Sequence, residues 1–385
     1  MKVLYSTMSV VEYDGSHYYN NPIKATYPRY LPLGDDITVI CFLKNTKQAK
    51  QDLIEDGVLK FRFVRKTNSL KSLLGEDRLY NKRLIEEEVK KADVCVLHMP
   101  CFHNNTVIKY AKKYGKPYMT VVCGCAFDEY WTYDWRGKLV APFAYYAFKN
   151  VQRKAPFSIY VTNSFLQKRY PTEGRSIGCS NVNINTGLSG VVEQRVSSIR
   201  ERSHKCERLK IGTAAAVDVP YKGQKDIVKA ISILHSEGID FEYHLVGRGD
   251  PSGLKRFSVE QGVGDLVIIH SAIPHEKVLE FYDSIDIYAQ PSRTEGLPRA
   301  LIEAMSRGCL CIGSNVGGIP ELLAPEFLFP KGNSKRIAMI LRRINKDELE
   351  KQAVRNYEKA KDYDVRVLNE RRATFIEDFA KTIKG

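Results

Sequence analysis

Residues 285–314 read IDIYAQPSRTEGLPRALIEAMSRGCLCIGS, and this stretch contains the unit from which the rest of the chain is built. An apolar run of strand length ends at Gln290, and a turn that contains Pro and Gly follows it. The run PRALIEAMSRG then has helical spacing, and CLCIGS is again apolar and of strand length. A strand, a helix and a second strand in this order predict two parallel strands joined by a covering helix.

The same alternation occurs on both sides of this stretch. In the first half of the chain it runs through six strand-like segments, which are KVLYSTM, DITVICFL, KFRFV, DVCVLHM, PYMTVVC and FSIYVTN. It restarts at RLKIGTA after a polar stretch over residues 186–207, which we interpret as an interdomain linker. A chain of 385 residues is too long for one ordinary core. We therefore predict an α/β protein with two doubly wound, Rossmann-like domains, residues 1–185 and 208–364, facing each other across a crevice.

The composition is that of a soluble globular protein, and no apolar run is long enough to span a membrane. The nine cysteines lie mostly in strand-like runs, which indicates buried, reduced thiols and a cytoplasmic location. The net charge of +14 is concentrated in residues 1–185, which hold 28 Lys and Arg against 17 Asp and Glu. This excess predicts an anionic partner such as a membrane surface, and the alternative is a solvated basic surface. Because no DNA- or RNA-binding motif is present, we expect no nucleic-acid partner.

Gly-containing turns follow three strands of the second domain, at residues 247–250, 291–298 and 314–320. The carboxyl ends of parallel strands meet at one edge of the sheet, where ligands of such folds bind. Glycine lets the backbone approach a ligand closely, and the start of a helix favours phosphate. Lys222 also lies before a helix start, where its charge is unfavourable unless an anion shares the site. These features predict an anionic ligand at this edge.

Two glutamates lie in the second of these turns and in the helix that follows it. We expect Glu295 to point from the loop towards the crevice and to bind sugar hydroxyls. Glu303 allows two interpretations. In the first, it lies on the solvated face of the helix and pairs with Arg299, four residues before it. In the second, the polar face borders the crevice and the Glu303 carboxylate accepts hydrogen bonds from two ribose hydroxyls.

The pattern P-S-x-x-E-G-L-P-x-x-x-x-E-A-M-x-x-G, followed by G-G-I-P-E, runs from Pro291 to Glu321. It resembles the retaining glycosyltransferases of family 4, whose hallmark is the E-x7-E pair formed here by Glu295 and Glu303. The resemblance is weaker over the rest of the second domain and is limited to the strand–helix rhythm in the first. It implies the two-domain GT-B fold, with a C-terminal helix, here residues 365–385, that crosses back to the first domain.

The resemblance also implies a role for each matching residue. Glu303 would hold the ribose of a nucleotide-sugar, and Glu295 would contact the donor sugar. Lys222 would neutralise the diphosphate, assisted by backbone N–H groups near Gly296 and Leu297. On the same basis the donor site also includes Gly247, Arg248, Ile273 and Arg299.

The sequence departs from the family pattern on both the donor side and the acceptor side of the site. The family's arginine, five or six residues before the lysine, is replaced by Ala216 and Val217, and Arg248 is our candidate substitute. The Gly-Gly turn after the first strand is replaced by YDGSHYY, and the histidine after the fifth strand is absent from VVCGCAFDEYW. The acceptor-side candidates in these two stretches are Gly15, His17, Cys123 and Asp128. We also take Asp128 as a catalytic candidate.

Together these features predict a retaining hexosyltransferase of cell-surface polysaccharide biosynthesis, with a UDP-linked donor and a glycan or lipid-linked acceptor. The alternatives are a sugar-nucleotide epimerase of the same fold and a non-enzymatic basic binding protein. The segment at 141–154 either lies against an anionic membrane, at its inner face, or is a core helix with a basic edge. No metal is expected, and the D-x-D at Asp362 and Asp364 is interpreted as the N-cap of a terminal helix.

Overall fold

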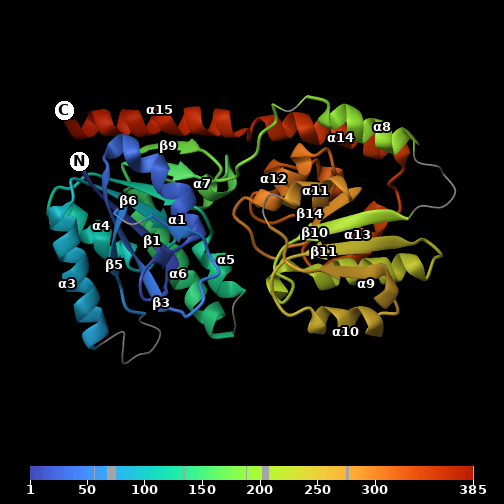
Figure 1. Ribbon diagram of the computed structural model, residues 1–385, viewed down its shortest axis with the longest axis horizontal. Helices are drawn as coiled ribbons and strands as arrows, with labels where there is room; N and C mark the ends of the chain where they lie inside the picture. The colour runs from blue at the N-terminus through green and yellow to red at the C-terminus, as the bar shows by residue number, and fades with distance from the viewer. Residues whose placement is uncertain are drawn as a thin grey trace. The chain divides into compact units, whose positions relative to one another are not determined.

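The computed structural model describes residues 1–55, 57–66, 75–132, 135–187, 189–201, 208–274 and 277–384 (Figure 1). The chain divides into two compact units. The first comprises Met1–Ala126, Pro142–Cys179 and Asn369–Gly385, and the second comprises Phe127–Ala141 and Ser180–Leu368. Among the described residues, no helix combines the length and the apolar character that crossing a bilayer requires.

A sheet with a parallel core forms the centre of the first unit. Its parallel strands, in spatial order, are β5 (Leu59–Phe63), β3 (Asp36–Asn45), β1 (Lys2–Tyr13), β6 (Val94–Met99), β7 (Tyr118–Val122), β8 (Phe157–Tyr160) and β9 (Arg175–Gly178). The short strands β2 (Tyr18–Tyr19) and β4 (Leu53–Ile54) add an antiparallel pairing next to β1. Strands such as β7 are buried along their whole length, as expected when helices cover both faces of a sheet.

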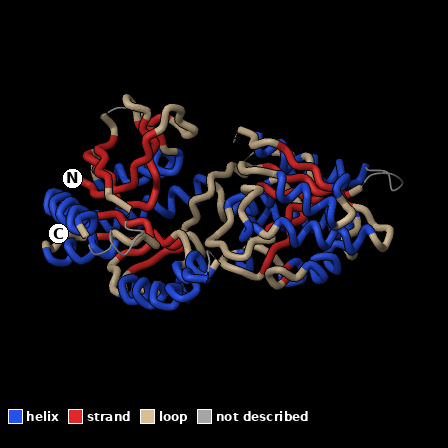
Figure 2. The backbone as a smooth tube through the Cα atoms, turned by 90° about the horizontal axis from the view of Figure 1, so that it is seen from below, coloured by secondary structure: helices blue, strands red, loops and turns tan. Residues whose placement is uncertain are grey.

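Helices accompany this sheet, as Figure 2 shows in blue around the red strands. The helices are α1 (Asn21–Thr26), η1 (Tyr27–Leu33), α3 (Glu76–Lys91), α4 (Asn104–Lys113), α5 (Ala126–Trp131), α6 (Trp135–Arg153), α7 (Phe165–Arg169) and α15 (Val365–Lys384). The division between the two units falls within α5, α6 and α15, so that Phe127–Ala141 and residues 365–368 belong to the second unit. Helices α3 and α4 follow β5 and β6, which is the strand–helix order that the sequence predicts.

The second unit contains a fully parallel sheet. Its strands, in spatial order, are β12 (Val267–His270), β11 (Phe241–Val246), β10 (Leu209–Ala214), β13 (Ile287–Gln290), β14 (Leu310–Ser314) and β15 (Leu328–Phe329). The order of the strands reverses between β10 and β13, so this pair forms the topological switch point of the sheet. Ligands of doubly wound folds bind beyond the carboxyl ends of the strands at such a point.

Helices of the second unit connect these strands and extend beyond them. They are α8 (Val191–Glu201), α9 (Gln224–His235), α10 (Ser252–Glu260), α11 (Val278–Asp283), α12 (Arg299–Ser306), α13 (Ser334–Leu341) and α14 (Lys346–Lys361). Apolar side chains of the sheet and of α9 and α13 form one buried cluster, which includes Ile211, Ile231 and Ile337. This core holds the strand ends in place, and the loops that leave them carry the candidate site.

The predicted linker, residues 186–207, contains the helix α8. This helix buries Val191 and Ile199 and carries a largely buried arginine, Arg195. The Arg195 guanidinium donates hydrogen bonds to the carbonyl oxygens of Tyr282 and Ile285, each at 2.7 Å, and of Arg307 at 3.0 Å. These carbonyls lie near the ends of α11 and α12, where backbone oxygens lack helical partners. A polar segment is thereby anchored to the second unit, whereas Leu188 and residues 202–207 lie outside the described part of the chain.

The two aspartates of the D-x-D sequence have different environments. Asp364 immediately precedes α15, and its carboxylate accepts hydrogen bonds from the backbone N–H of Arg366 at 2.9 Å and of Thr186 at 2.7 Å. The predicted N-cap is therefore confirmed for Asp364. Asp362 instead ends α14, and its exposed carboxylate pairs with Lys359. The hydrogen bonds from Arg366, together with those from Thr186, hold the pKa of Asp364 well below its usual range.

Replacing Asp364 with alanine is expected to lower the free energy of unfolding by about 1–2 kcal/mol at pH 7, because the N-cap is lost. The lowered pKa of Asp364 means that its stabilisation is complete above the ordinary pKa of aspartate, about 4, and is lost as the pH falls below it. The difference between wild type and Asp364→Ala should therefore shrink towards acid pH in denaturant titrations. Asp362→Ala is the matched control and should change stability by less than about 0.5 kcal/mol. Equal effects of the two variants would contradict the N-cap assignment.

Candidate active site

The candidate active site lies at the carboxyl edge of the sheet in the second unit, where glycines bring neighbouring loops together. Added to Gly223, a Cβ atom would lie 2.1 Å from the carbonyl oxygen of Pro291. A Cβ atom on Gly317 would lie 2.2 Å from the carbonyl oxygen of Glu295, and Gly317 has a φ of +57°. Since any larger residue would push these loops apart, the glycines permit the close contact from which the site is built.

An ion pair joins the segments that follow the two strands of the switch point. Lys222 ends the short helix η2 (Pro220–Lys222), which follows β10, whereas Glu295 lies in the loop after β13. The Nζ atom of Lys222 lies 2.8 Å from Oε1 of Glu295, and both side chains are largely buried. The sequence predicts both residues, and the fold brings them together across 73 positions of the chain.

Two further side chains orient the carboxylate of Glu295. Its Oε1 atom accepts hydrogen bonds from the Ser292 hydroxyl at 2.7 Å and from the Gln290 amide at 3.1 Å. The amide oxygen of Gln290 in turn accepts from the Tyr288 hydroxyl at 3.0 Å. Burial raises the pKa of Tyr288, so the phenol stays protonated and donates. Among the described residues, no hydrogen bond engages Oε2 of Glu295, so this oxygen is able to accept from a ligand hydroxyl.

Glu303 is held by a buried tyrosine. It lies in α12, and its Oε2 atom accepts a hydrogen bond of 3.0 Å from the hydroxyl of Tyr282 in α11. Burial, with smaller contributions from Tyr288 and Glu303, raises the pKa of Tyr282, so that this group remains a donor. Both Arg299 and Glu303 belong to the described part of the chain, and no ion pair joins them there. The interpretation of Glu303 as the surface partner of Arg299 is therefore wrong.

The remaining donor-side candidates lie in the same loops. A Cβ atom on Gly247 would lie 1.8 Å from the carbonyl oxygen of Ala215, so this glycine allows the loops after β10 and β11 to touch. The carbonyl oxygen of Gly296 accepts a hydrogen bond of 2.6 Å from Gly318, which ties the loops after β13 and β14 together. The other candidates are the exposed Arg248, the half-buried Ile273, the buried Leu297 and the exposed Arg299.

Comparisons with known proteins agree with this geometry. Residues 197–362 match the family described as Glycosyl transferases group 1. Protein CapJ from Staphylococcus aureus is 29% identical over 349 residues, which cover 89% of this chain and 85% of CapJ. The amylovoran biosynthesis glycosyltransferase AmsK from Erwinia amylovora is 30% identical over 184 residues, which cover 45% of this chain and 44% of AmsK. The structure of Anabaena HepE in complex with UDP aligns with a TM-score of 0.67 at 16% identity, over 98% of this chain and 100% of HepE.

These findings support a glycosyltransferase of the GT-B fold. The GT-B fold predicted from the sequence is confirmed by the structural match and by the two Rossmann-like halves.

The acceptor-side candidates have local structural roles. Gly15 and His17 lie in the hairpin turn between β1 and β2, where the Asp14 carboxylate accepts from the backbone N–H groups of Ser16 and His17, each at 2.8 Å. These hydrogen bonds, with the one from Tyr19, lower the pKa of Asp14 to about 2. A Cβ atom on Gly15 would meet nothing within 4 Å, so this turn does not provide the close approach that a Gly-Gly turn would.

The other two acceptor-side candidates lie beyond β7. The backbone N–H of Cys123 donates to the carbonyl oxygen of Met99 at 2.8 Å, and its thiol is half-buried. Asp128 lies in the first turn of α5, and its carbonyl oxygen accepts from the Thr132 hydroxyl at 2.7 Å. For all four residues, a role in acceptor binding stays a prediction.

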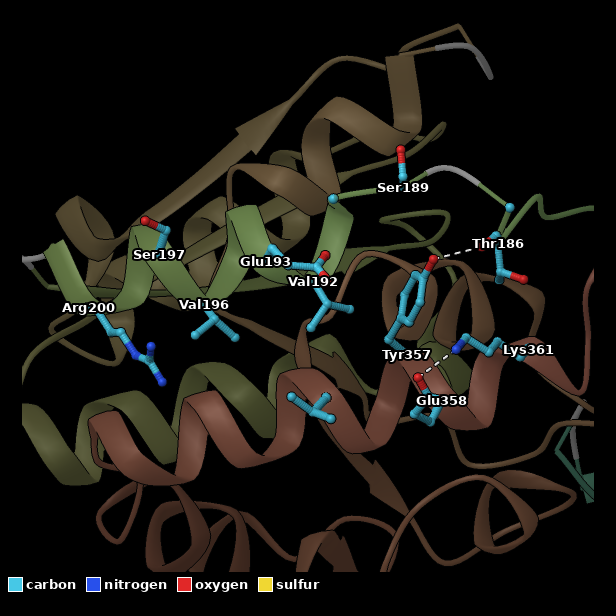
Figure 3. A pocket seen from close by; sticks show the side chains of 13 residues that line it. Thr186, Ser189, Val192, Glu193, Val196, Ser197, Arg200, Tyr357, Glu358 and Lys361 are labelled. Carbon is cyan, nitrogen blue, oxygen red and sulfur yellow. Dashed lines mark hydrogen bonds and ion pairs between the residues drawn. The ribbon is translucent and has the colours of Figure 1, made fainter.

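Two cavities of similar size lie in the second unit. One of 730 Å³ is bordered by α8 and α14, and Figure 3 shows Tyr357 and Lys361 among the side chains that line it. None of the predicted site residues lines this cavity. The other cavity, of 710 Å³, adjoins the site, because Tyr221 and Gly223 on either side of Lys222 line it. Within the described part of the chain, no group of three or more His, Cys, Asp or Glu side chains is arranged to hold a metal ion.

Several residues of the site were missed by the sequence analysis. Gln290 ends β13 directly before the motif, and Ser292 is the second residue of the motif. The available signal was that both are polar side chains at the end of an apolar strand. For Tyr282 there was no signal in the sequence, since its contact with Glu303 depends on how α11 packs beside α12. Arg293 pairs with the buried carboxylate of Asp226 at 3.1 Å, and this pair also depends on the tertiary fold.

Proposed function

We propose that the chain is a retaining glycosyltransferase that transfers a sugar from a UDP-sugar to a glycan or lipid-linked acceptor in polysaccharide biosynthesis. The observation that carries the proposal is the Lys222–Glu295 contact across the switch point, with Glu303 on the adjoining helix. The printed descriptions of two similar proteins agree with it. AmsK is named for amylovoran biosynthesis, and HepE is described with UDP.

In this proposal, the diphosphate of the donor lies next to Lys222 and near the start of α12. As the donor bond breaks, negative charge grows on the leaving diphosphate, and a pre-positioned ammonium group stabilises it. The N–H groups near Gly296 and Leu297 precede the N-terminus of α12 and add the favourable field of a helix start. Since these groups supply the positive charge, we propose that no metal is required.

In this proposal, Glu303 and Glu295 bind different parts of the donor. Glu303 accepts hydrogen bonds from the ribose hydroxyls through the oxygen that Tyr282 leaves available. Glu295 receives its orientation from Lys222, Ser292 and Gln290, and its Oε2 atom accepts from a hydroxyl of the donor sugar. A carboxylate near the anomeric carbon also favours the positive charge of an oxocarbenium-like transition state.

Retention follows from attack on the face that the leaving group vacates. The bond between the anomeric carbon and the phosphate oxygen breaks, and the acceptor hydroxyl oxygen bonds to the same face. The leaving phosphate takes the proton of that hydroxyl, so charge and protons balance. We propose that the reaction takes place in the cytoplasm, at the inner face of the membrane if the acceptor is lipid-linked.

Saturation-transfer NMR against UDP-, GDP- and dTDP-sugars tests the donor, and proton NMR of the product tests the anomeric configuration. We expect binding of a UDP-sugar and a product with the donor's configuration, at a rate that EDTA leaves unchanged. An inverted product would contradict retention, and loss of activity in EDTA would contradict metal independence. Turnover of the donor with no acceptor present would favour an epimerase instead.

A further inference from the structure

Helix α6 has an apolar stripe that faces solvent. Trp135, Leu139, Phe143 and Tyr146 are 67%, 65%, 77% and 63% exposed. At these spacings the four side chains fall on one face of the helix. The opposite face is buried, since Ala141, Phe148 and Gln152 are at most 4% exposed. The stripe therefore begins earlier than the segment 141–154 that the sequence suggested, and the end of that segment contributes to the core.

This stripe is unusual for a protein surface. Single exposed apolar residues are common, but a row of four large ones along a helix marks an interaction surface. Trp and Tyr are enriched where an apolar environment meets water, because their rings combine an apolar body with a polar atom. The composition of the stripe therefore fits an interface between water and lipid better than the interior of a protein complex.

The basic side chains around the stripe favour an anionic partner. Helix α6 contains Arg136, Lys138, Lys149 and Arg153 and no acidic residue. Arg136 and Lys138 are exposed and Lys149 is half-buried, whereas the exposed Arg153 already pairs with Glu173 at 2.7 Å. A basic helix with an apolar face binds the surface of an anionic bilayer, with the apolar face in the boundary of the acyl chains. A second copy of the chain would bring like charges together at the same surface, which disfavours a dimer through this face.

We propose that the exposed face of α6 docks on an anionic lipid bilayer, with Trp135, Leu139, Phe143 and Tyr146 inserted at the interface. The basic side chains on either side of the stripe contact the lipid headgroups. This inference goes beyond the proposed transferase reaction, because none of the four stripe residues belongs to the donor site, although Lys138 beside the stripe also lines the cavity that adjoins that site. Docking is measured without donor or acceptor, so its failure and the failure of the transferase proposal are distinguishable.

Intrinsic fluorescence reports on this surface directly, because the two tryptophans of the chain are Trp131 and Trp135. In the variant Trp131→Phe, emission comes from Trp135 alone. We expect its maximum to move to shorter wavelength with phosphatidylcholine vesicles that contain phosphatidylglycerol, and not with pure phosphatidylcholine. High salt should reduce the shift, because it screens charges near the surface. An unchanged spectrum with anionic vesicles would overturn the proposal, as would a concentration-dependent shift without vesicles, which would indicate self-association.

Vesicle flotation with point variants tests the two halves of the surface separately. Phe143→Ser should lower partitioning into anionic vesicles about tenfold, since a buried aromatic ring is lost from the interface. Lys138→Gln should lower it about fivefold, the effect of one basic side chain near an anionic surface. The matched control is Val259→Ser, at a residue of α10 that is 69% exposed, and it should leave partitioning unchanged. Equal partitioning of Phe143→Ser and wild type, or an equal loss in the control, would place the docking surface elsewhere.

Discussion

Lys222→Ala is expected to lower kcat for sugar transfer by about 10²–10³-fold, the cost of removing one group that stabilises developing negative charge. The ammonium group of Lys222 is held at the switch point by Glu295, so it is in place before the donor binds. The effect should fall mainly on kcat, because the charge on the leaving diphosphate is greatest in the transition state. Initial rates with a saturating donor measure it.

The matched control is Lys225→Ala. This lysine lies three residues further along, at the start of α9, and its exposed side chain lies above the ring of Phe257 at 4.8 Å. Lys225 contributes a similar long-range electrostatic field but does not contact Glu295 or its partners Gln290 and Ser292. Its removal should therefore change kcat by less than about threefold. If both variants lost activity equally, the role of Lys222 would be a general field effect. An active Lys222→Ala enzyme would remove the main support for the proposed function.

Glu303→Ala should weaken UDP binding about 100-fold, as measured by calorimetry. Hydrogen bonds to a charged group contribute about 1.5–3 kcal/mol each, and about 2.7 kcal/mol corresponds to this factor. The loss should appear with UDP alone, because the proposed partner of Glu303 is the ribose and not the transferred sugar. UDP binding that is unaffected by the substitution would show that Glu303 does not contact the nucleotide.

The variant Tyr282→Phe distinguishes the orientation of the Glu303 carboxylate from its direct contact with the nucleotide. It removes the hydrogen bond of 3.0 Å to Glu303 but leaves the carboxylate itself in place. We expect about tenfold weaker UDP binding, intermediate between wild type and Glu303→Ala. Glu280→Ala, an exposed glutamate on the same helix as Tyr282, is the control and should bind UDP as wild type does. A loss of binding in that control would point to disruption of α11 as a whole.

The exact bounds of several elements differ from those that the sequence predicts. Pro298 is the N-cap of α12, and the helix begins at Arg299, one residue later than expected. Strand β1 extends to Tyr13, beyond the predicted run KVLYSTM, and forms a hairpin with β2. Such differences arise because hydrophobic periodicity locates an element well and its ends poorly.

The sequence by itself determined the strand–helix alternation and the positions of Lys222, Glu295 and Glu303 at the ends of strands or in the following helix. These features depend on local hydrophobic periodicity and on turn residues, and both can be recognised from residues that are close together in the sequence. A parallel sheet then places the loops on one edge, so the location of the site follows from the pattern alone.

Only the tertiary structure decided which of these side chains touch. The Lys222–Glu295 contact, the support of Glu303 by Tyr282 and the anchoring of α8 by Arg195 each join residues that are far apart in the sequence. The exposed face of α6 is of the same kind, since an amphipathic pattern does not reveal which side the core covers. The physical reason is that strand order and helix packing set these contacts, and both result from burying apolar surface over a whole unit rather than from any one segment.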